Sequence, residues 1–592
     1  MSNVESLITE HIDTWTSAVK TKSSAGRGSS NKRELYGIKK LRELILQLAV
    51  RGLLVPQCSK DQPASLLTER LKLEKEQKIK DKKIKKLKAL PDIPDGEKLF
   101  KLPAGWEWCR LQDVIDVRDG THDSPKDAIG DNTFPLITSK NFSKGRIDFE
   151  NARRISEKDH LEISKRSIVE VDDILFSMIG GNIGNQVIVT DSQPFSIKNV
   201  ALFKYYDKLA TLPKFIKIFT EELAVELQHK ASGGAQPFVS LGALRKLVIA
   251  LPPASEQKKI IAKFFELISL CDQLEQQTDT SIDAHETLIS TLLKALTDSA
   301  ASTESGAEQF QQAWNRIAEN FDVLFTTESS IGQLKQTILQ LAVMGKLVPQ
   351  GPNDEPASAF LEKIAAEKEK LVKDKTIKKQ KSLPSITEDE KPFELPVGWE
   401  FERIGTFGIV GTGATPSRTN SAYWNPAEIN WVSSGETSEL FVGETKEKVS
   451  ELAVKETNVS IYPPGTLIVA MYGQGKTRGQ ISELLEEAGT NQACAAIRLV
   501  DKATHHKDYV KLYFRKSYAE LRRQAAGGAQ PNLNVGKIAN TILAMPPLAE
   551  QERIVSQAEK LLSICDALKE KINCVQSIQL NIADAITYQS LN

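Results

Sequence analysis

One frame of short motifs occurs twice in this chain of 592 residues, and the repetition limits what the chain can fold into. The frame consists of Leu-Pro-x-Gly-Trp-Glu at 102–107 and 395–400, Gly-Gly-Ala-Gln-Pro at 233–237 and 527–531, and Pro-Pro-x-x-Glu-Gln at 252–257 and 546–551. The two tryptophans lie 293 residues apart (399 − 106) and the first glycines 294 apart (527 − 233). One residue of drift over a whole domain indicates an internal two-fold duplication.

The repeat begins before the tryptophan motif. Ile-Leu-Gln-Leu-Ala-Val at 45–50 returns at 338–343, with apolar residues at helical spacing, and the first copy is stopped by Gly52. Lys/Glu-rich segments at 63–88 and 356–381 follow, and each is predicted to be a helix. Two interpretations of these segments stay open. They are either basic arms that lie near phosphates or solvated helix faces with Glu–Lys pairs.

Between the tryptophan and the Gly-Gly motif, the two copies share little sequence. Both contain short β-type runs separated by Gly- and Asp-rich turns, for example 174–177 and 429–432, and both then continue into a helix, at 213–230 and at about 509–524. Each copy is therefore predicted to be an α+β domain of about 150 residues, a common domain size.

A long helix follows each Pro-Pro motif, and about 40 residues at 1.5 Å each predict a rod of roughly 60 Å. Apolar residues at steps of four and three form a heptad-like seam, which indicates that the two helices pair with each other. The first seam continues to Leu288 and Leu292, and the second to Val575, Ile582 and Ile586. The central seam residues are Ile260, Phe264, Leu267, Cys271 and Leu274 in the first helix, and Ile554, Ala558, Leu561, Cys565 and Leu568 in the second.

The predicted fold class is α+β, with two globular α+β domains separated by long, paired, coiled-coil-like helices. The predicted divisions are an N-terminal helical region (1–100), a first variable domain (101–252), a central helical region (253–393) with a linker near 298–312, a second variable domain (394–546) and a C-terminal long helix (547–592).

Composition narrows the class of partner. Lys+Arg and Asp+Glu are both 77, which argues against a uniformly basic nucleic-acid coat but permits local basic patches. No run approaches 18 apolar residues, so no membrane partner is expected. The six cysteines lack the spacing of a metal site, and the N-terminus is too polar for a signal peptide. A cytoplasmic location is expected.

Two similar halves with divergent contents suit double-stranded DNA, because its backbone is pseudo-symmetric while its base sequence is not. A rod of fixed length between the two domains would set a fixed spacing between two half-sites. The ordered double set of motifs resembles the specificity subunit of type I restriction–modification enzymes, over nearly the whole chain. Within the variable domains, 119–125, 135–141, 173–180, 413–418, 423–424, 429–432 and 490–495 are similar to that family's target-recognition domains. One departure is the helical region of about 100 residues before the first tryptophan motif.

The resemblance implies that the chain itself is not catalytic and holds no cofactor. Each target-recognition domain would read one half of a bipartite, asymmetric DNA site, and the long helices would set the spacer. The helical regions would dock two modification subunits, which bring S-adenosylmethionine and methylate adenine. Restriction subunits, which use ATP and Mg, would cleave unmodified DNA.

Readout of base edges requires polar or basic side chains on loops held by a rigid scaffold. Gln236 and Gln530 belong to both copies and are not expected to specify bases, and the adjacent glycines favour a tight bend. The candidates are Thr121, His122, Ser124, Lys126, Ser139, Lys140 and Asn141 in the first domain, and Thr415, Ser417, Arg418, Ser433, Tyr472, Gln474, Lys476 and Arg478 in the second.

Three other functions compete with this interpretation. Residues 470–477 (Ala-Met-Tyr-Gly-Gln-Gly-Lys-Thr) fit a permissive phosphate-loop pattern and would indicate an ATP-binding enzyme, if a helix follows them. A methyltransferase would need an Asn/Asp-Pro-Pro-aromatic motif, and neither Pro-Pro pair has these neighbours. A coiled-coil scaffold would explain the long helices but not the two divergent domains.

Overall fold

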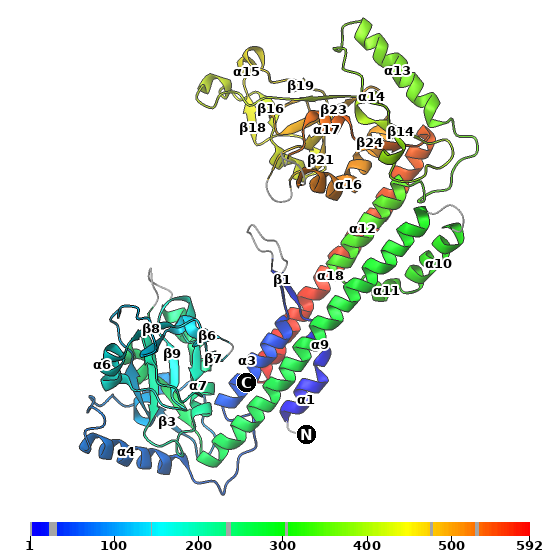
Figure 1. Ribbon diagram of the computed structural model, residues 1–592. Helices are drawn as coiled ribbons and strands as arrows, with labels where there is room; N and C mark the ends of the chain where they lie inside the picture. Colours follow the sequence, from blue (N-terminus) through cyan, green and yellow to red (C-terminus); the bar gives the residue numbers. More distant parts are fainter. Residues whose placement is uncertain are drawn as a thin grey trace. The chain divides into compact units, whose positions relative to one another are not determined.

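The computed structural model describes residues 3–22, 32–143, 145–231, 238–301, 306–473, 477–526 and 532–591. The chain forms two compact units that do not follow chain order. One unit holds residues 30–279 together with the N-terminal segment and 576–592, and the other holds 280–575. Each unit contains an α+β domain attached to helices (Figure 1). The predicted α+β class, with a duplicated domain and long helices, is confirmed.

The first α+β domain is built on two small sheets. The larger has the order β10-β9-β12-β4, formed by Gln186–Ile188, Ile174–Ser177, Val200–Tyr205 and Ile115–Asp119. The smaller has the order β11-β5-β8, formed by Ser196–Ile197, Thr133–Ile137 and Arg153–Ser156, with β5 and β11 parallel. Every residue of β9 is buried, which explains its uninterrupted apolar sequence.

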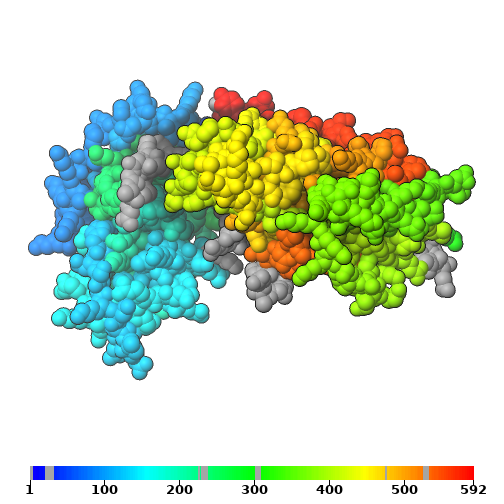
Figure 2. All heavy atoms as spheres, turned by 90° about the horizontal axis from the view of Figure 1, so that it is seen from above, coloured from blue at the N-terminus to red at the C-terminus, as the bar shows by residue number. Residues whose placement is uncertain are grey.

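The second α+β domain repeats this strand order although its sequence differs. Its larger sheet has the order β15-β23-β20-β21, formed by Gly408–Thr412, Cys494–Leu499, Leu467–Ala470 and Ile481–Leu484, and adds the edge strand β17 (Phe441–Val442). Its smaller sheet has the order β18-β16-β22-β19, formed by Glu447–Val449, Ile429–Val432, Ala488–Thr490 and Ile461–Tyr462. In the space-filling view, residues of this domain, drawn in yellow, form a continuous surface (Figure 2). The duplication therefore extends through the variable regions.

The repeated motifs close each domain onto its long helix. β3 (Glu107–Arg110) pairs with β13 (Val248–Leu251), and β14 (Glu400–Arg403) pairs with β24 (Ile542–Met545), so the first and last strands of each copy are neighbours. Trp399 Nε1 donates to Glu550 Oε2 at 3.0 Å. Glu256, the matching residue of the first copy, accepts from Gln57 Nε2 at 2.7 Å.

The side chain of the glutamine that ends each Pro-Pro motif is also hydrogen-bonded. Gln257 Nε2 donates to Ala210 O at 2.9 Å and Pro252 O at 3.1 Å. Gln551 Nε2 donates to Pro546 O at 2.9 Å. Because both glutamines are buried, their hydrogen bonds fix the junction between the last strand and the helix. The shared motifs thus form a structural frame.

The first unit contains a bundle of α3 (Tyr36–Val50), the first part of α9 (Ala254–Ala301) and the end of α18 (Leu548–Gln589). Arg42 of α3 pairs with Asp272 at 2.6 Å and with Glu275 at 2.5 Å. Tyr36 Oη donates to Asp584 Oδ1 of α18 at 2.8 Å. These contacts hold all three helices together.

The second unit contains the equivalent bundle of α12 (Glu328–Val343), the first part of α18 and the end of α9. Lys335 of α12 pairs with Asp566 of α18, the counterpart of the Arg42–Asp272 pair. Residues of α9, α12 and α18 share one apolar cluster, which includes Ile289, Ile338 and Leu562. Each bundle therefore combines the start of its own long helix with the end of the other.

The predicted seam residues lie mostly on the buried face. Ile260, Phe264, Leu267, Cys271, Ile554, Ala558 and Cys565 are buried, while Leu274, Leu561 and Leu568 are half-buried. Toward the helix ends the predicted seam is wrong by one residue at Leu288 and at Ile582, whereas Ile586 is buried as predicted. Leu288 is 50% exposed and Ile289 is buried, and Ile582 is 43% exposed while Ala583 is buried. An α-helix has 3.6 residues per turn, so its buried face drifts away from a strict heptad.

Two helix ends and one predicted linker differ from the predictions. α4 (Ala64–Lys80) and α13 (Ala357–Lys373) end well before 88 and 381, because Lys82 (φ 57°) and Lys375 (φ 55°) adopt the left-handed conformation that terminates a helix. The predicted linker at 298–312 is mostly helical, since α9 continues to Ala301 and α10 (Gly306–Glu319) follows.

The sequence placed α1 (Asn3–Glu10), α2 (Ile12–Ser17) and α11 (Phe321–Leu324) within predicted helical regions without giving their bounds, and α10 overlaps the predicted linker. The Gly-Gly-Ala-Gln-Pro motifs, with Gln236 and Gln530, lie outside the described residues. Among the helices that the structure describes, none combines the length and the apolar character needed to cross a bilayer.

Candidate nucleic-acid interface

In each domain, a glycine marks the point where the chain leaves the larger sheet and enters its first loop. Gly120 follows β4 and Gly413 follows β15, at matching positions of the duplication. A Cβ atom on either glycine would overlap the backbone carbonyl of a crossing strand, at Ile197 and at Thr490 respectively. Only glycine permits this crossing, which releases the chain into a surface loop at the same place in both domains.

The loop of the first domain carries four predicted candidates, and most of it is exposed. The His122 ring lies between Asp119 Oδ2 and Asn199 Oδ1, each at 3.1 Å from a ring nitrogen. Lys198 donates to Ser124 Oγ, and Thr121 Oγ1 accepts from Asp123 N at 3.1 Å. Lys126 is exposed. The loop is thus held by hydrogen bonds while its outer side remains accessible.

A capping turn follows the central strand of the smaller sheet in each domain. In the first domain, Asn141 Oδ1 accepts from Thr138 N at 3.0 Å and from Thr138 Oγ1 at 3.1 Å. In the second, Glu436 Oε2 accepts from Ser433 N at 2.7 Å and from Ser433 Oγ at 3.0 Å. The side chain of Asn141 is buried and committed to this turn, so its prediction as a base contact is withdrawn. Ser139 is half-buried and Lys140 exposed on the same turn.

The first loop of the second domain is built on two tryptophans. The indole nitrogens of Trp424 and Trp431 donate to Ser417 O and Ala414 O, both at 3.1 Å. The two rings meet edge to face, with centroids 5.3 Å apart. This packing fixes the backbone that carries the candidates Thr415, Ser417 and Arg418.

Arg418 has a defined orientation at the surface. Its guanidinium lies 3.8 Å from the centre of the Trp424 ring and binds both carboxylate oxygens of Glu447, at 2.6 and 2.9 Å. The Arg418 hydrogen bond lowers the pKa of Glu447. A guanidinium has five N–H donors, so this one retains donors beyond the ion pair. Thr415 bonds to Gln492, and Ser417 Oγ lies 2.8 Å from Thr419 Oγ1.

The third candidate loop follows β20. Tyr472 and Arg478 are half-buried, and Arg478 Nη2 donates to Gly473 O at 3.4 Å. Gln474 and Lys476 lie outside the described residues. Strand β21 begins at Ile481, where a phosphate loop would open a helix. The structure therefore counts against the ATP-binding alternative.

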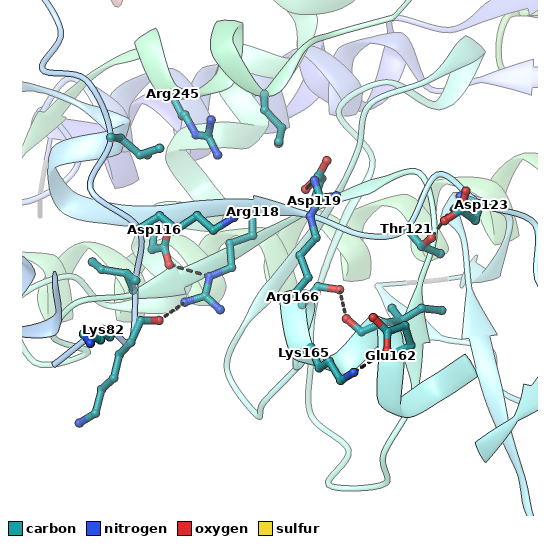
Figure 3. A pocket seen from close by; sticks show the side chains of 17 residues that line it. Lys82, Asp116, Arg118, Asp119, Thr121, Asp123, Glu162, Lys165, Arg166 and Arg245 are labelled. Carbon is teal, nitrogen blue, oxygen red and sulfur yellow. Dashed lines mark hydrogen bonds and ion pairs between the residues drawn. The ribbon is translucent and has the colours of Figure 1, made fainter. Parts of the chain in front are cut away.

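The structure brings together a basic hollow that the sequence did not reveal. A cavity of about 680 Å³ is lined by Lys82, Lys83, Lys85, Arg118, Arg166 and Arg245, and Figure 3 labels Lys82 and the three arginines. Acidic residues lie among them, and Arg118 Nε donates to Asp116 Oδ2 at 2.7 Å. The run of lysines was visible in the sequence, but no signal linked it to arginines that lie far away along the chain.

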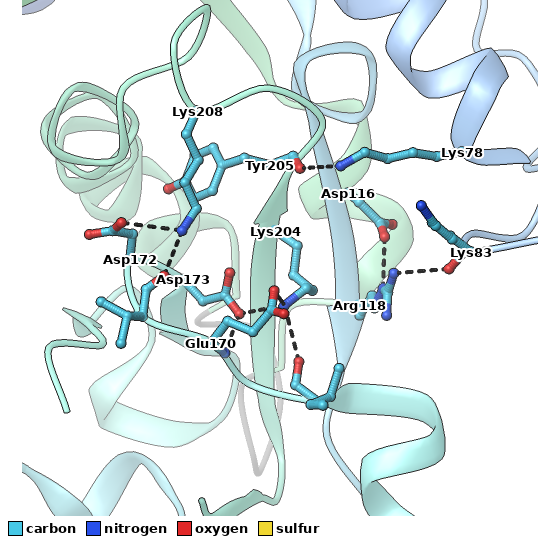
Figure 4. Close-up of polar contacts among 12 residues, drawn as sticks. Lys78, Lys83, Asp116, Arg118, Glu170, Asp172, Asp173, Lys204, Tyr205 and Lys208 are labelled. Atoms are coloured by element: carbon cyan, nitrogen blue, oxygen red, sulfur yellow. Dashed lines mark hydrogen bonds and ion pairs between the residues drawn. The ribbon is translucent and has the colours of Figure 1, made fainter. Parts of the chain in front are cut away.

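Polar contacts of Lys204 tie β12 of the larger sheet to the buried Asp173 and to the exposed Glu170. Lys204 Nζ lies 2.7 Å from Asp173 Oδ2 and 2.8 Å from Glu170 Oε2 (Figure 4). Burial raises the pKa of Asp173. Lys78, near the end of α4, donates to Tyr205 O at 3.1 Å, which docks α4 on the same sheet (Figure 4). The contacts are structural, because each partner belongs to the domain itself.

The chain is similar to known proteins over its full length. Residues 103–284 and 396–575 each match the family model of the type I restriction modification DNA specificity domain. The EcoAI specificity subunit of Escherichia coli is 38% identical over the full length of both chains, and the EcoEI specificity subunit of Escherichia coli is 37% identical over the same extent. The solved HsdS subunit from Thermoanaerobacter tengcongensis aligns over 84% of this chain and 98% of its own, at 16% identity and a TM-score of 0.38.

Two α+β domains that present different polar loops from one repeated helical frame have the architecture of a sequence-recognition protein. The chain belongs to the type I restriction–modification DNA specificity family. It is a specificity subunit with two target-recognition domains, and it recognises DNA without being an enzyme. Both of its matched regions are DNA specificity domains of the type I restriction–modification kind.

Proposed function

We propose that each target-recognition domain reads one half of a bipartite, asymmetric DNA site and that the long helices set the spacer between the halves. The helical bundles dock two modification subunits, which bring S-adenosylmethionine and methylate adenine. Restriction subunits with ATP and Mg join this complex and cleave unmodified DNA. The chain acts in the cytoplasm and holds none of these cofactors itself.

The observation that carries this proposal is a common frame with different loops. Both domains end in a Pro-Pro-x-x-Glu-Gln junction whose glutamate and glutamine are hydrogen-bonded, and the strands of the first domain recur in the same order in the second, which adds β17 and β19. Their loops nevertheless differ: the first domain orients His122 through Asp119 and Asn199, whereas the second stacks Arg418 on Trp424. Shared supports with different loop chemistry are suited to two different half-sites on one duplex.

The residues proposed to contact bases or nearby phosphates are those that the structure leaves on these loops. Rigid support lowers the cost of ordering such side chains on binding, and hydrogen bonds to base edges discriminate between base pairs. In the first domain they are Thr121, His122, Ser124, Lys126, Ser139 and Lys140. In the second they are Thr415, Ser417, Arg418, Ser433, Tyr472 and Arg478, and Gln474 and Lys476 remain predictions.

Methylome sequencing tests the proposal. Cells that express the chain with its modification subunit should carry one two-part motif with a fixed gap, methylated on adenine in both strands and lost when the chain is deleted. Replacing residues 108–232 with the equivalent region of another family member should change one half of that motif. Replacing the same region with a synonymous coding sequence is the matched control.

Two results would contradict the proposal. If no methylated motif depends on the chain, it does not direct modification. If the domain replacement changes both halves of the motif together, the two domains do not read independent half-sites.

A further inference from the structure

Two lysine-rich segments fall outside the recognition loops. They are residues 82–88 (Lys-Lys-Ile-Lys-Lys-Leu-Lys), here the first lysine segment, and 375–381 (Lys-Thr-Ile-Lys-Lys-Gln-Lys), the second lysine segment. We propose that both segments bind the phosphate backbone of duplex DNA beside the half-site of their own domain, whatever its base sequence. This inference rests on the proposed function, because its ligand is the duplex that the domains read.

The two segments match each other in register. Lysines occur at four equivalent positions, 293 residues apart, and neither segment contains an acid. The flanking recognition loops share no such agreement. The two domains read different half-sites, so side chains that they share should contact a part of DNA that is present at every site. The phosphates are such a part.

The backbone of each segment is anchored to its domain. Each begins at a left-handed residue that ends a helix, and each then places one isoleucine inward, with Ile84 half-buried and Ile377 buried. Beyond the segments, Arg110 Nη2 donates to Asp92 O at 3.4 Å and Arg403 Nη2 donates to Ser385 O at 3.5 Å. Because the chain is held at both ends, little backbone freedom is left to lose on binding.

The lysine side chains themselves are available. Lys85, Lys86, Lys88, Lys378, Lys379 and Lys381 are all exposed. Within the described part of the chain, none of these six forms an ion pair. Exposed lysines are commonly solvated, but the chain as a whole has no net positive charge. The unpaired lysines at matched positions therefore concentrate positive charge locally, as binding to the phosphate backbone of DNA requires.

The position of the first lysine segment favours DNA over a protein partner. Lys82, Lys83 and Lys85 line the same hollow as Thr121 and Asp123, at the start of the recognition loop (Figure 3). Seven basic and four acidic side chains line that hollow, so its lining is net positive although Arg166 pairs with Asp119. A duplex that reaches the loop would therefore bring its phosphates close to the lysines.

The test uses the complete modification complex and two duplexes, one with its methylation motif and one with that motif scrambled. Binding is measured by fluorescence anisotropy from 50 to 300 mM salt for K85Q/K86Q, K378Q/K379Q and the combined variant. The control is K72Q/K258Q, which removes the same charge from exposed lysines outside the segments. Each lost phosphate contact lowers the slope of log affinity against log salt by about 0.9, so each double variant is expected to lose up to about 1.8.

The loss should be similar on both duplexes, and the methylated motif should stay the same. If the slopes of log affinity against log salt equal those of the control variant, the inference is overturned. It is also overturned if the variants fail to recruit modification subunits while the assembled complex binds DNA with unchanged affinity. A separate outcome concerns the proposed function alone. If the unaltered complex shows no preference for its motif duplex, the specificity role fails, whatever the lysine variants do.

Discussion

In the second copy of the repeated frame, the side chain of Glu550 joins the tryptophan motif to the start of α18. It accepts the indole hydrogen of Trp399 at 3.0 Å and is buried. Burial raises the pKa of Glu550 above its usual 4.5. The folded protein therefore binds this proton more readily than the unfolded chain does. The ionised carboxylate costs stability at neutral pH, and the cost is relieved as the pH falls through the raised pKa.

Replacing Glu550 with glutamine should remove this pH dependence while retaining an acceptor for Trp399. The apparent melting temperature of the modification complex with E550Q, relative to the unaltered complex, should be more favourable at pH 7.5 than at pH 5, because more of the buried Glu550 carboxyl is ionised at the higher pH. The exposed Glu570 of the same helix, replaced in the same way, serves as the control. A difference that is constant, or that runs in the opposite direction, would show that the buried charge is not destabilising.

Gly345 is another residue that the frame constrains. Its φ is +67°, and an added Cβ would lie 2.7 Å from Pro396 Cγ and 2.9 Å from Trp399 Cζ2. Gly345→Ala should therefore destabilise the second unit by about 2–4 kcal/mol, from backbone strain and overpacking. Gly332→Ala in α12 is the matched control, because it has open space and should stabilise by up to about 1 kcal/mol. Urea unfolding measures both, and equal effects would contradict the assigned packing.

Single residues also show what the sequence was able to predict about the site. His122 and Arg418 were identified as polar residues in Gly-rich turns, and the structure places both on oriented surface loops. Asn141 belonged to the same pattern but caps its own turn, because asparagine serves turn geometry as readily as recognition. Arg118 and Arg166 lay outside any motif, since only the fold brings them to Lys82.

At the scale of elements, α13 depends on one lysine for its position. Lys368 Nζ donates to the carbonyl oxygens of Gly405, Thr406 and Gly408, at 2.6, 3.0 and 3.1 Å. Lys75 in α4 makes the equivalent contact with Gln112 O at 3.0 Å. Both helices lie beside the domain that follows them in the chain (Figure 1). This docking fixes the chain that continues into each lysine segment.

Lys368→Met should loosen α13 from its domain. The substitution leaves three carbonyl oxygens without their charged donor, which costs about 1.5–3 kcal/mol. Amide hydrogen exchange across 357–373 should become faster, while exchange in β20 and β23 stays unchanged. Lys370→Met is the control, because Lys370 is exposed and its one ion pair among the described residues is with Glu367, at 3.8 Å. Unchanged exchange in α13 would mean that its apolar contacts alone hold it.

Elements differ in how far their bounds follow from sequence. The runs predicted at 174–177 and 429–432 match β9 and β16, because buried strands read as short apolar runs between turn residues. The end of α4 did not follow, since a lysine-rich sequence gives no sign that Lys82 adopts a left-handed φ. The serine- and alanine-rich stretch near 298–312 was predicted as a linker, yet it includes the end of α9 and the start of α10.

At the scale of the whole molecule, the two long helices exchange their ends. α9 begins in the first unit and ends in the second, while α18 begins in the second and ends in the first. Equivalent ion pairs, Arg42–Asp272 and Lys335–Asp566, bind the start of each long helix to its own bundle. Reciprocal exchange of this kind is expected of a two-fold repeat, in which each half offers the same surface to the other.

A chain with two copies of the first recognition domain tests that expectation. Residues 401–526 would be replaced by 108–232, so that both frames hold the same loops. In a two-fold repeat the second copy reads the duplex in the opposite sense. The methylome should then contain an interrupted inverted repeat of the first half-site, with the original gap. The converse chain, with two copies of the second domain, should give an inverted repeat of the other half-site. A direct repeat would instead indicate a translational arrangement, and an unchanged asymmetric motif would show that the loops do not determine the sequence recognised.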